Sequence, residues 1–242
     1  MLGKLSIKMD YIKDLILRSF KLTGYKISKI KDKSNYYKRW DILKENGLEV
    51  NTVIDIGVGY GTIELYKNAT FEYLFLVEPL EVYKSEISNI LKTFNGEWCK
   101  TALSDFQGNT EINYYAKYPE KTSVKDRVNK FERKGEKKNV SVEVNTLDGI
   151  IKNKSFGTPI GIKIDAEGNE LNILKGSVST LEYTKYVVVE APIVERFSNG
   201  YSLEELIKFM NENDFYIKNV VDVDDGSIVK FIDFLFYNRK YD

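Results

Sequence analysis

Short apolar runs alternate with amphipathic segments through most of the chain, which is the pattern of an α/β fold. Between residues 52 and 103 this alternation predicts three strands separated by two helices. Such a series forms a parallel sheet with right-handed crossover connections. The expected strands are 52–56, 73–78 and 98–103, and the expected helices are 62–68 and 82–94.

The second half of the chain continues the alternation and then ends in a hairpin. Its helix begins after Ser202, with Glu205 in the position of a capping-box partner. The last two strands are expected to run antiparallel around a turn closed by Asp225-Gly226. The predicted elements are strands at 160–165 and 185–190, a helix at 203–213, and strands at 215–221 and 230–237.

Two further strands, 110–115 and 140–145, alternate in β fashion and are expected to pair as an excursion from the main sheet. The segment between them, 116–139, holds 9 Lys or Arg against 4 acidic residues and predicts a mobile loop. It is either a solvated connector or a cover that contacts an anionic acceptor such as a sugar phosphate.

Residues 1 to 40 hold 11 Lys or Arg against 3 Asp, and 11–22 has the spacing of an amphipathic helix. This helix either packs on the sheet with a solvated basic side or is attracted to an anionic membrane surface or a lipid-linked substrate. We therefore expect a basic helical extension at 1–50, including a short helix at 41–48. One domain follows at 51–242, with the excursion and its mobile basic loop at about 110–146.

The strand at 52–56 contains Asp55 near its end and runs into Gly57, Gly59 and Gly61. Glycines permit positive φ and leave room for a ligand against the backbone. The third glycine of a dinucleotide fingerprint would fall on Thr62, which disfavours a nicotinamide cofactor. A carboxylate here attracts cations, and S-adenosyl-L-methionine carries an ammonium and a sulfonium.

An acidic residue, Glu78, closes the second strand, where it can accept hydrogen bonds from both ribose hydroxyls of such a cofactor. The glycine loop alone is also typical of a plain strand-to-helix turn. The loop and Glu78 together favour the cofactor over the plain turn.

The segment 160–176 reads I-G-I-K-I-D-A-E-G-N-E-L-N-I-L-K-G. Together with Thr146-Leu147-Asp148 and 187–190, it resembles the FkbM family of S-adenosyl-L-methionine-dependent methyltransferases, whose hallmark is K-[ILV]-D-x-E-G-x-E-x-x-[IVL]-L-x-G. The resemblance covers roughly residues 52–190. Its glycine loop is a looser match, with Val58 and Tyr60 where the family more often has D-[VI]-G-A-N-x-G.

This resemblance implies a Rossmann-like class I methyltransferase sheet of strand order 3-2-1-4-5-7-6, with the last strand antiparallel. It also implies S-adenosyl-L-methionine as the cofactor and a small molecule or glycan as the acceptor, including sugars of surface polysaccharides, glycolipids and secondary metabolites. In this class the position of Ser104-Asp105 lies near adenine, so Asp105 is a candidate acceptor for its exocyclic amine. Ser-Asp is equally a turn starter.

Methyl transfer to a hydroxyl needs a group that takes the proton, and the chain has no histidine. Four carboxylates are expected at the carboxyl ends of strands, and Asp165 is the first candidate because its strand lies beside the first one. Helix capping also accounts for Asp165, and an ion pair with Lys163 would lower its pKa and weaken it as a base. The four are Asp148, Asp165, Glu167 and Glu190.

A divalent cation that acidifies the hydroxyl is a further alternative, though it is not predicted; its ligands would be Asp148, Asp165 and Glu190. Asp165-Ala166-Glu167-Gly168 is not the N/D-P-P-[YF] run of enzymes that methylate base amines, so oxygen is the expected acceptor atom.

The amino-acid composition further narrows the class of protein to which this chain can belong. Of 242 residues 43% are apolar, enough for one large α/β domain, while the single Cys99 and the lack of histidine exclude an internal disulfide and disfavour structural zinc. The sequence shows neither a signal peptide nor a membrane span and predicts a cytoplasmic protein, with peripheral contact at the inner membrane face left open. It does not predict an oligomeric state.

Three functions compete. The first is a sugar O-methyltransferase, and the second is an RNA ribose 2′-O-methyltransferase that uses Lys163, Asp165 and Glu190 and holds phosphate with the basic insert. The zero net charge makes a nucleic-acid partner the weaker expectation. The third is a non-catalytic binding module, against which the acids at Asp55, Glu78 and Asp165 argue.

Overall fold

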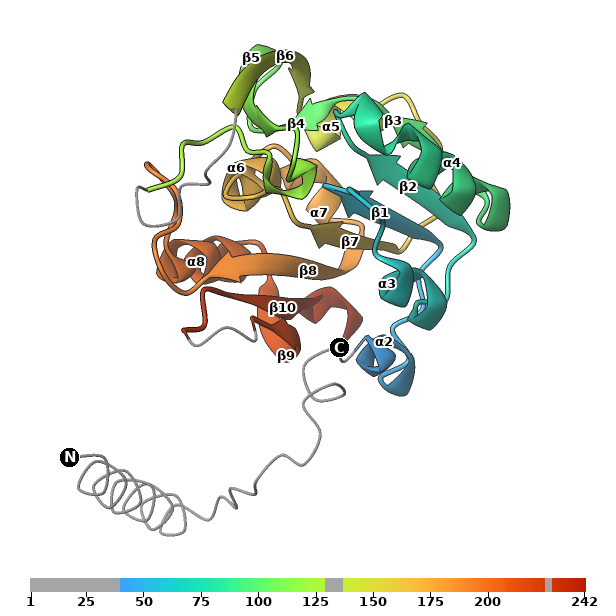
Figure 1. Ribbon diagram of the computed structural model, residues 1–242. Coiled ribbons are helices and arrows are strands. Elements are labelled where there is room, and N and C mark those ends of the chain that lie inside the picture. Colours follow the sequence, from blue (N-terminus) through green and yellow to red (C-terminus); the bar gives the residue numbers. More distant parts are fainter. Residues whose placement is uncertain (1–39, 129–136, 225–227) are drawn as a thin grey trace, which may run out of the picture. The chain divides into compact units, whose positions relative to one another are not determined.

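A computed structural model describes residues 40–128, 137–224 and 228–242 (Figure 1). These residues belong to one compact unit, Tyr37–Asp242. The predicted basic helix at 11–22 and the predicted turn at Asp225-Gly226 lie outside the described residues, so both stay predictions.

The main sheet has the strand order β3-β2-β1-β7-β8-β10-β9. The first five strands in this order are parallel, while β10 runs antiparallel to both of its neighbours. Counting only the strands of this sheet along the chain, the order is 3-2-1-4-5-7-6, so the predicted fold class is confirmed. The strands are β1 Thr52–Ile56, β2 Tyr73–Val77, β3 Gly96–Cys99, β7 Ile160–Ile164, β8 Thr184–Pro192, β9 Phe215–Val223 and β10 Phe231–Asn238.

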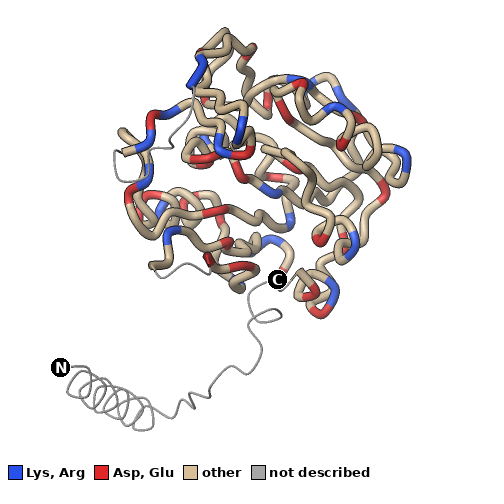
Figure 2. The backbone as a smooth tube through the Cα atoms, viewed as in Figure 1, with Lys and Arg blue, Asp and Glu red and all other residues tan. Residues whose placement is uncertain are grey.

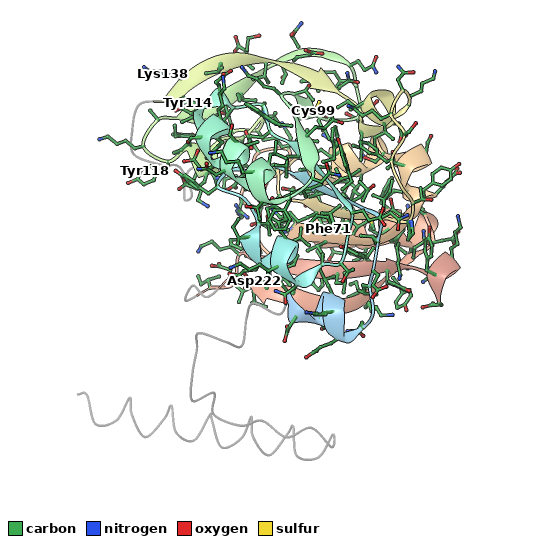
Figure 3. All side chains as sticks on the ribbon, turned by 90° about the vertical axis from the view of Figure 1, so that its right-hand side faces the viewer. Phe71, Cys99, Tyr114, Tyr118, Lys138 and Asp222 are labelled. Atoms are coloured by element: carbon green, nitrogen blue, oxygen red, sulfur yellow. The ribbon has the colours of Figure 1, made fainter. Side chains whose placement is uncertain are left out.

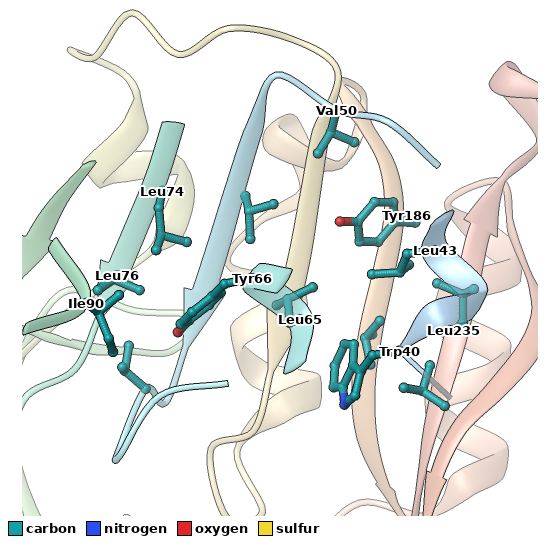
Figure 4. Close-up of a cluster of buried hydrophobic side chains, with 14 of the residues drawn as sticks. Trp40, Leu43, Val50, Leu65, Tyr66, Leu74, Leu76, Ile90, Tyr186 and Leu235 are labelled. Atoms are coloured by element: carbon teal, nitrogen blue, oxygen red, sulfur yellow. The ribbon is translucent and has the colours of Figure 1, made fainter. Parts of the chain in front are cut away.

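Helices cover both faces of this sheet because alternate strand residues point to opposite sides. Val53 of β1 packs in one cluster with residues of α2, α3 and α4 (Figure 4), whereas Ile54 packs in a second cluster with residues of α5, α6, α7 and α8. Full burial stabilises each such aliphatic side chain by about 1.5–3 kcal/mol. The helices are α2 Asp41–Glu45, α3 Ile63–Asn68, α4 Lys84–Thr93, α5 Leu147–Ile151, α6 Glu170–Lys175, α7 Val178–Leu181 and α8 Leu203–Glu212, with 3-10 turns η1 Glu81–Tyr83, η2 Pro119–Lys121 and η4 Arg239–Tyr241.

The predicted start of α8 is confirmed in atomic detail. Ser202 Oγ accepts a hydrogen bond from Glu205 N at 3.2 Å, and Glu205 Oε2 accepts one from Ser202 N at 2.7 Å. These reciprocal bonds satisfy backbone N–H groups that the first turn of a helix leaves without partners.

The strand predicted at 98–103 is divided in the structure. Its first part is the end of β3, while β4 (Ala102–Leu103) joins a second sheet of order β4-β6-β5. Thr101 makes the break, because its N–H bonds back to the Cys99 carbonyl at 3.1 Å and its Oγ1 donates to the Glu143 carbonyl at 3.1 Å. The excursion thus begins before the point that the sequence predicted.

The two predicted excursion strands are present and antiparallel as β5 (Gly108–Tyr115) and β6 (Lys137–Asn145). In Figure 3 the labelled Tyr114, Tyr118 and Lys138 lie together at this part of the molecule. Residues 116–128 of the predicted mobile loop make defined hydrogen bonds that are described below, while 129–136 lie outside the described residues. The mobility of the loop stays a prediction.

Candidate active site

The glycine loop after β1 is shaped by its neighbours. Gly57, Gly59 and Gly61 have φ of +77°, +51° and +92°, a region that disfavours other L-residues. A Cβ on Gly57 would lie 1.8 Å from the carbonyl oxygen of Asp165, so this glycine lets the loop pack against the end of β7. A Cβ on Gly59 would meet nothing closer than 3.9 Å.

A cavity of about 260 Å³ opens where β1, β2 and β7 end. Of the residues predicted for cofactor binding or catalysis, seven line it and four do not. The seven are Gly57, Gly59, Gly61, Glu78, Lys163, Asp165 and Glu167. The four are Asp55, Ser104, Asp105 and Glu190, and the candidate metal ligand Asp148 also lies outside the lining.

Glu78 is 5% exposed at the end of β2 and is held by two backbone donors. Its Oε2 accepts from Gly59 N at 3.1 Å and its Oε1 from Leu80 N at 2.9 Å. Burial raises the pKa of this carboxyl to about 7, although the two backbone N–H groups act in the opposite direction. The carboxylate is therefore fixed in the cavity wall with lone pairs left for a ligand.

Asp55 lies beneath the loop and is fully buried. Its Oδ2 accepts the hydroxyl of Tyr66, and its Oδ1, which has no hydrogen bond among the described residues, lies 3.9 Å from Lys163 Nζ. Burial raises the pKa of Asp55, opposed by the charge of Lys163. Asp55 does not line the cavity. Its predicted electrostatic preference for a cationic cofactor stays a prediction.

The expected pair of Lys163 and Asp165 is present, with Nζ 3.2 Å from Oδ2. Lys163 is buried, which disfavours its charge, but the carboxylates of Asp165, Asp55 and Asp233 outweigh burial and raise its pKa. Lys163 is thus a fixed cation. The Asp165 side chain is 38% exposed, and it faces the cavity.

Glu167 and Glu190 are engaged by arginine. Arg196 Nη2 lies 2.6 Å from Glu167 Oε2 and its Nη1 lies 2.6 Å from Glu190 Oε1. Glu190 borders a second cavity of about 260 Å³, together with Glu170 and Tyr201. Burial and the nearby charge of Asp165 raise the pKa of Glu190, while Arg196 opposes that shift.

The other predicted residues lie away from the cavity. Ser104 and Asp105 follow β4 in the small sheet, where Ser104 Oγ donates to Asp105 Oδ1 at 3.2 Å, and Thr101, Ala102 and Leu103 line the cavity instead. The proposed contact of Asp105 with adenine stays a prediction that this placement does not support.

Asp148 is occupied with capping α7. Its carboxylate accepts from Thr180 N at 2.8 Å, Thr180 Oγ1 at 2.6 Å and Ser179 N at 3.0 Å. Within the described ranges, no group of three His, Cys, Asp or Glu side chains is arranged to hold a metal ion.

Several polar residues of this region were missed by sequence reasoning, besides the cations that pair with Glu167. Tyr83 and Thr122 line the cavity, and among the described residues their buried hydroxyls have no hydrogen-bond partner. Tyr66 holds Asp55, and Asp233 of β10 lies opposite Glu190 of β8. A charged residue within the apolar run 231–236 was the available signal for Asp233.

The strand order is that of the class I methyltransferase sheet, and the glycine loop and the acid after the second strand both line the cavity where its strands end. The sequence profile described as "Methyltransferase FkbM domain" matches residues 55–217. The chain therefore belongs to the FkbM family of methyltransferases, and S-adenosyl-L-methionine-dependent methyl transfer is the chemistry of its class. A comparison with curated proteins finds no match.

This chain is also similar to solved structures, at low sequence identity. A methyltransferase FkbM from Methylobacillus flagellatus is 17% identical (TM-score 0.49) over 83% of this chain and 48% of its own, so the chain spans about half its length. The magnesium protoporphyrin IX methyltransferase of Synechocystis, with bound SAM, is 9% identical (TM-score 0.46) over 82% of this chain and 74% of its own. A S-adenosylmethionine-dependent methyltransferase from Clostridium acetobutylicum is 11% identical (TM-score 0.45) over 97% of this chain and 99% of its own.

The cavity fits S-adenosyl-L-methionine by its chemistry. Glu78 offers a fixed carboxylate for ribose hydroxyls, and Gly59 leaves open space beside it. Apolar side chains wall the same cavity, and the hydroxyls of Tyr83 and Thr122 can pair with polar atoms of a ligand.

Across the described part of the chain, no helix is long and apolar enough to cross a membrane.

Proposed function

We propose that this protein transfers a methyl group from S-adenosyl-L-methionine to a hydroxyl oxygen of a sugar, in a glycan, a glycolipid or a related small molecule. The observation that carries the proposal is that the glycine loop, Glu78 and Asp165 all line one and the same cavity. The residues to which we assign cofactor binding and the partly exposed carboxylate of Asp165 therefore border the same space. Family membership supplies the reaction class, and the acceptor is our inference.

In this proposal Glu78 binds the ribose hydroxyls, and the backbone around Gly59 lies against the cofactor. The cofactor supplies an electrophilic methyl group on a sulfonium. The acceptor oxygen must approach that carbon from the side opposite the sulfur, and positioning accounts for much of the rate in such a displacement.

Asp165 is the carboxylate best placed to accept the hydroxyl proton. Its side chain is 38% exposed, whereas Glu167 is held by arginines and Glu190 borders the other cavity. Lys163, fixed 3.2 Å from Asp165 Oδ2, orients that carboxylate. The acceptor hydroxyl would donate its proton to Asp165 as oxygen attacks the methyl carbon.

The first test is calorimetric titration of the purified protein with S-adenosylhomocysteine, with NAD and GTP as controls. We expect micromolar binding of S-adenosylhomocysteine alone. Equal affinity for the controls, or no binding of any of the three, would remove the methyltransferase activity and leave a binding module with this fold.

The second test concerns Asp165. Turnover with sugar acceptors and S-adenosyl-L-methionine, with and without magnesium, should be abolished in Asp165→Asn, while affinity for S-adenosylhomocysteine stays within a few-fold. Glu64→Gln, an exposed acid on α3, is the control and should retain turnover. An active Asp165→Asn enzyme would exclude Asp165 as the base.

The RNA alternative rests on the basic insert. Lys121 and Arg127 lie near the cavity but pair with Glu167, and Lys125 Nζ donates to the Asn199 carbonyl at 3.0 Å. In Figure 2 basic and acidic residues are interspersed along the described backbone. A steep loss of RNA binding with salt would favour this alternative, because a sugar-directed enzyme releases no counterions.

A further inference from the structure

Glu167 joins segments that are far apart in the sequence. Lys121 Nζ lies 3.3 Å from its Oε1, and Arg127 Nη2 lies 2.7 Å from its Oε2. Arg196 Nη2 reaches the same Oε2 at 2.6 Å. Three cations from two loops therefore converge on one buried carboxylate of the β7–α6 turn.

The first loop, which we call the cover, is the stretch 118–128 of the excursion. Its residues 119, 120 and 122–124 line the cavity. The Ser123 hydroxyl donates to the Glu167 carbonyl at 2.6 Å, and the Ser123 carbonyl accepts from Asn113 N at 2.8 Å. Glu167 thus holds the cover with its backbone as well as with its side chain.

The second loop, 193–200, closes the arrangement from the other side. Val128 N donates to the Arg196 carbonyl at 3.0 Å, and the Arg127 guanidinium lies 4.6 Å from the centre of the Phe197 ring. Phe197 in turn packs on Gly168, where a Cβ would meet its ring at 2.6 Å. The two loops therefore contact each other as well as Glu167.

The backbone of Glu167 has a positive φ, which is uncommon for a residue other than glycine and supports a role for this turn in directing its side chain. Its φ is +47°, a left-handed conformation that is strained for a residue with a side chain. The following residue, Gly168, has φ of +99°. This turn directs the Glu167 carboxylate toward the two loops, and both of its oxygens are occupied by cationic donors.

We propose that Glu167 is a positioning residue, which holds the cover over the cavity by pairing with Lys121, Arg127 and Arg196. It does not act as the proton acceptor. The cover forms one wall of the cavity, so its position sets the shape that the cofactor and the acceptor must fit. Glu167, one of the four carboxylates that the sequence made candidates for the proton acceptor, thus positions the cover instead.

The direct test is hydrogen–deuterium exchange of the full chain without ligand. In Glu167→Gln, the amides of peptides that cover 118–128 should exchange at least about tenfold faster, because a buried set of cations loses its shared anion. Glu195→Gln is the matched control: it removes the same charge from an exposed residue next to Arg196, and exchange should change by less than about twofold. Unchanged exchange in Glu167→Gln would overturn the proposal.

A double-mutant cycle with S-adenosylhomocysteine separates positioning from direct contact. We expect Glu167→Gln and Arg127→Gln each to weaken binding about tenfold, and the double variant to be no weaker than the weaker single one. Additive losses would mean that Glu167 contacts the ligand directly. If Glu167→Gln does not fold, faster exchange of the cover in Arg127→Gln supports the proposal and unchanged exchange overturns it.

The two proposals can fail separately. A wild-type protein that binds no S-adenosylhomocysteine would refute the methyltransferase function, while exchange in the ligand-free chain would still decide the role of Glu167.

Discussion

At the scale of single residues, Glu78 both holds the glycine loop and lines the cavity. Its two oxygens are held by backbone N–H groups of Gly59 and Leu80, so the loop positions the acid and the acid positions the loop. We predict that Glu78→Ala weakens S-adenosylhomocysteine binding by about 1–3 kcal/mol, through loss of hydrogen bonds to the ribose. Calorimetry measures the change, with the exposed Glu72→Ala as control. Unchanged affinity would remove Glu78 from the binding site.

Asp233 predicts a pH dependence of stability. Burial, with a further contribution from the charge of Asp165, raises its pKa to about 7, while Lys163 opposes the shift. The folded state therefore binds a proton more tightly than the unfolded state, so the stability from this group is present at low pH and lost as pH rises toward 7. Asp233→Asn should stabilise the protein by about 2–4 kcal/mol at pH 8 and by far less near pH 4, measured by urea unfolding. An equal effect at both pH values would contradict this.

Local patterns predicted the residues whose roles depend on sequence neighbours. The glycine loop, Glu78 and the Ser202 cap are of this kind, and all three are found where expected. The partners of buried charges were not predictable in the same way, because Arg196 reaches Glu167 across 29 positions and only the fold brings them together. The roles of the site residues stay predictions until the variants are measured.

At the scale of elements, we predict that substitutions at two glycines of the loop have different effects, one on folding stability and the other on ligand binding. Gly57→Ala should destabilise the fold by more than about 2 kcal/mol, since its Cβ would overlap the Asp165 carbonyl at 1.8 Å and force β1 from β7. Gly59→Ala should cost only about 1–2 kcal/mol of backbone strain yet abolish S-adenosylhomocysteine binding, because its Cβ enters the cavity. Urea unfolding and calorimetry on both variants separate the effects. If Gly59→Ala loses as much stability as Gly57→Ala and still binds S-adenosylhomocysteine, the prediction for Gly59 is refuted.

The elements of the main sheet were predictable because each has its own hydrophobic period and the crossover rule limits their order. The division of 98–103 between two sheets was not. Both halves are apolar enough to form strands, and the choice depends on Thr101, whose side chain bonds to β6 some 42 positions later. The contacts of the cover also depend on a distant residue, Glu167. The local composition of residues 118–128 gave no sign of these contacts.

At the scale of the whole molecule, the chain divides into Met1–Tyr36 and Tyr37–Asp242, and those described residues that line the cavity lie between Ile56 and Ile173. We predict that a variant lacking residues 1–36 binds S-adenosylhomocysteine with affinity within about twofold of the full chain, because it retains each described residue that lines the cavity. A large loss of affinity would place part of the site in the removed residues.

The same truncation separates the two interpretations of the basic extension. Residues 1–40 contain eleven Lys or Arg and three Asp. Each Lys or Arg close to an anionic lipid surface contributes about 1 kcal/mol of attraction. If this attraction operates, the full chain co-sediments with vesicles that contain phosphatidylserine, and the truncated chain does not. Neutral vesicles and high salt, which screens the attraction, are the controls. If the extension instead packs on the domain, neither chain binds vesicles and the truncated one unfolds at lower urea, because the apolar face of that helix would leave core surface exposed.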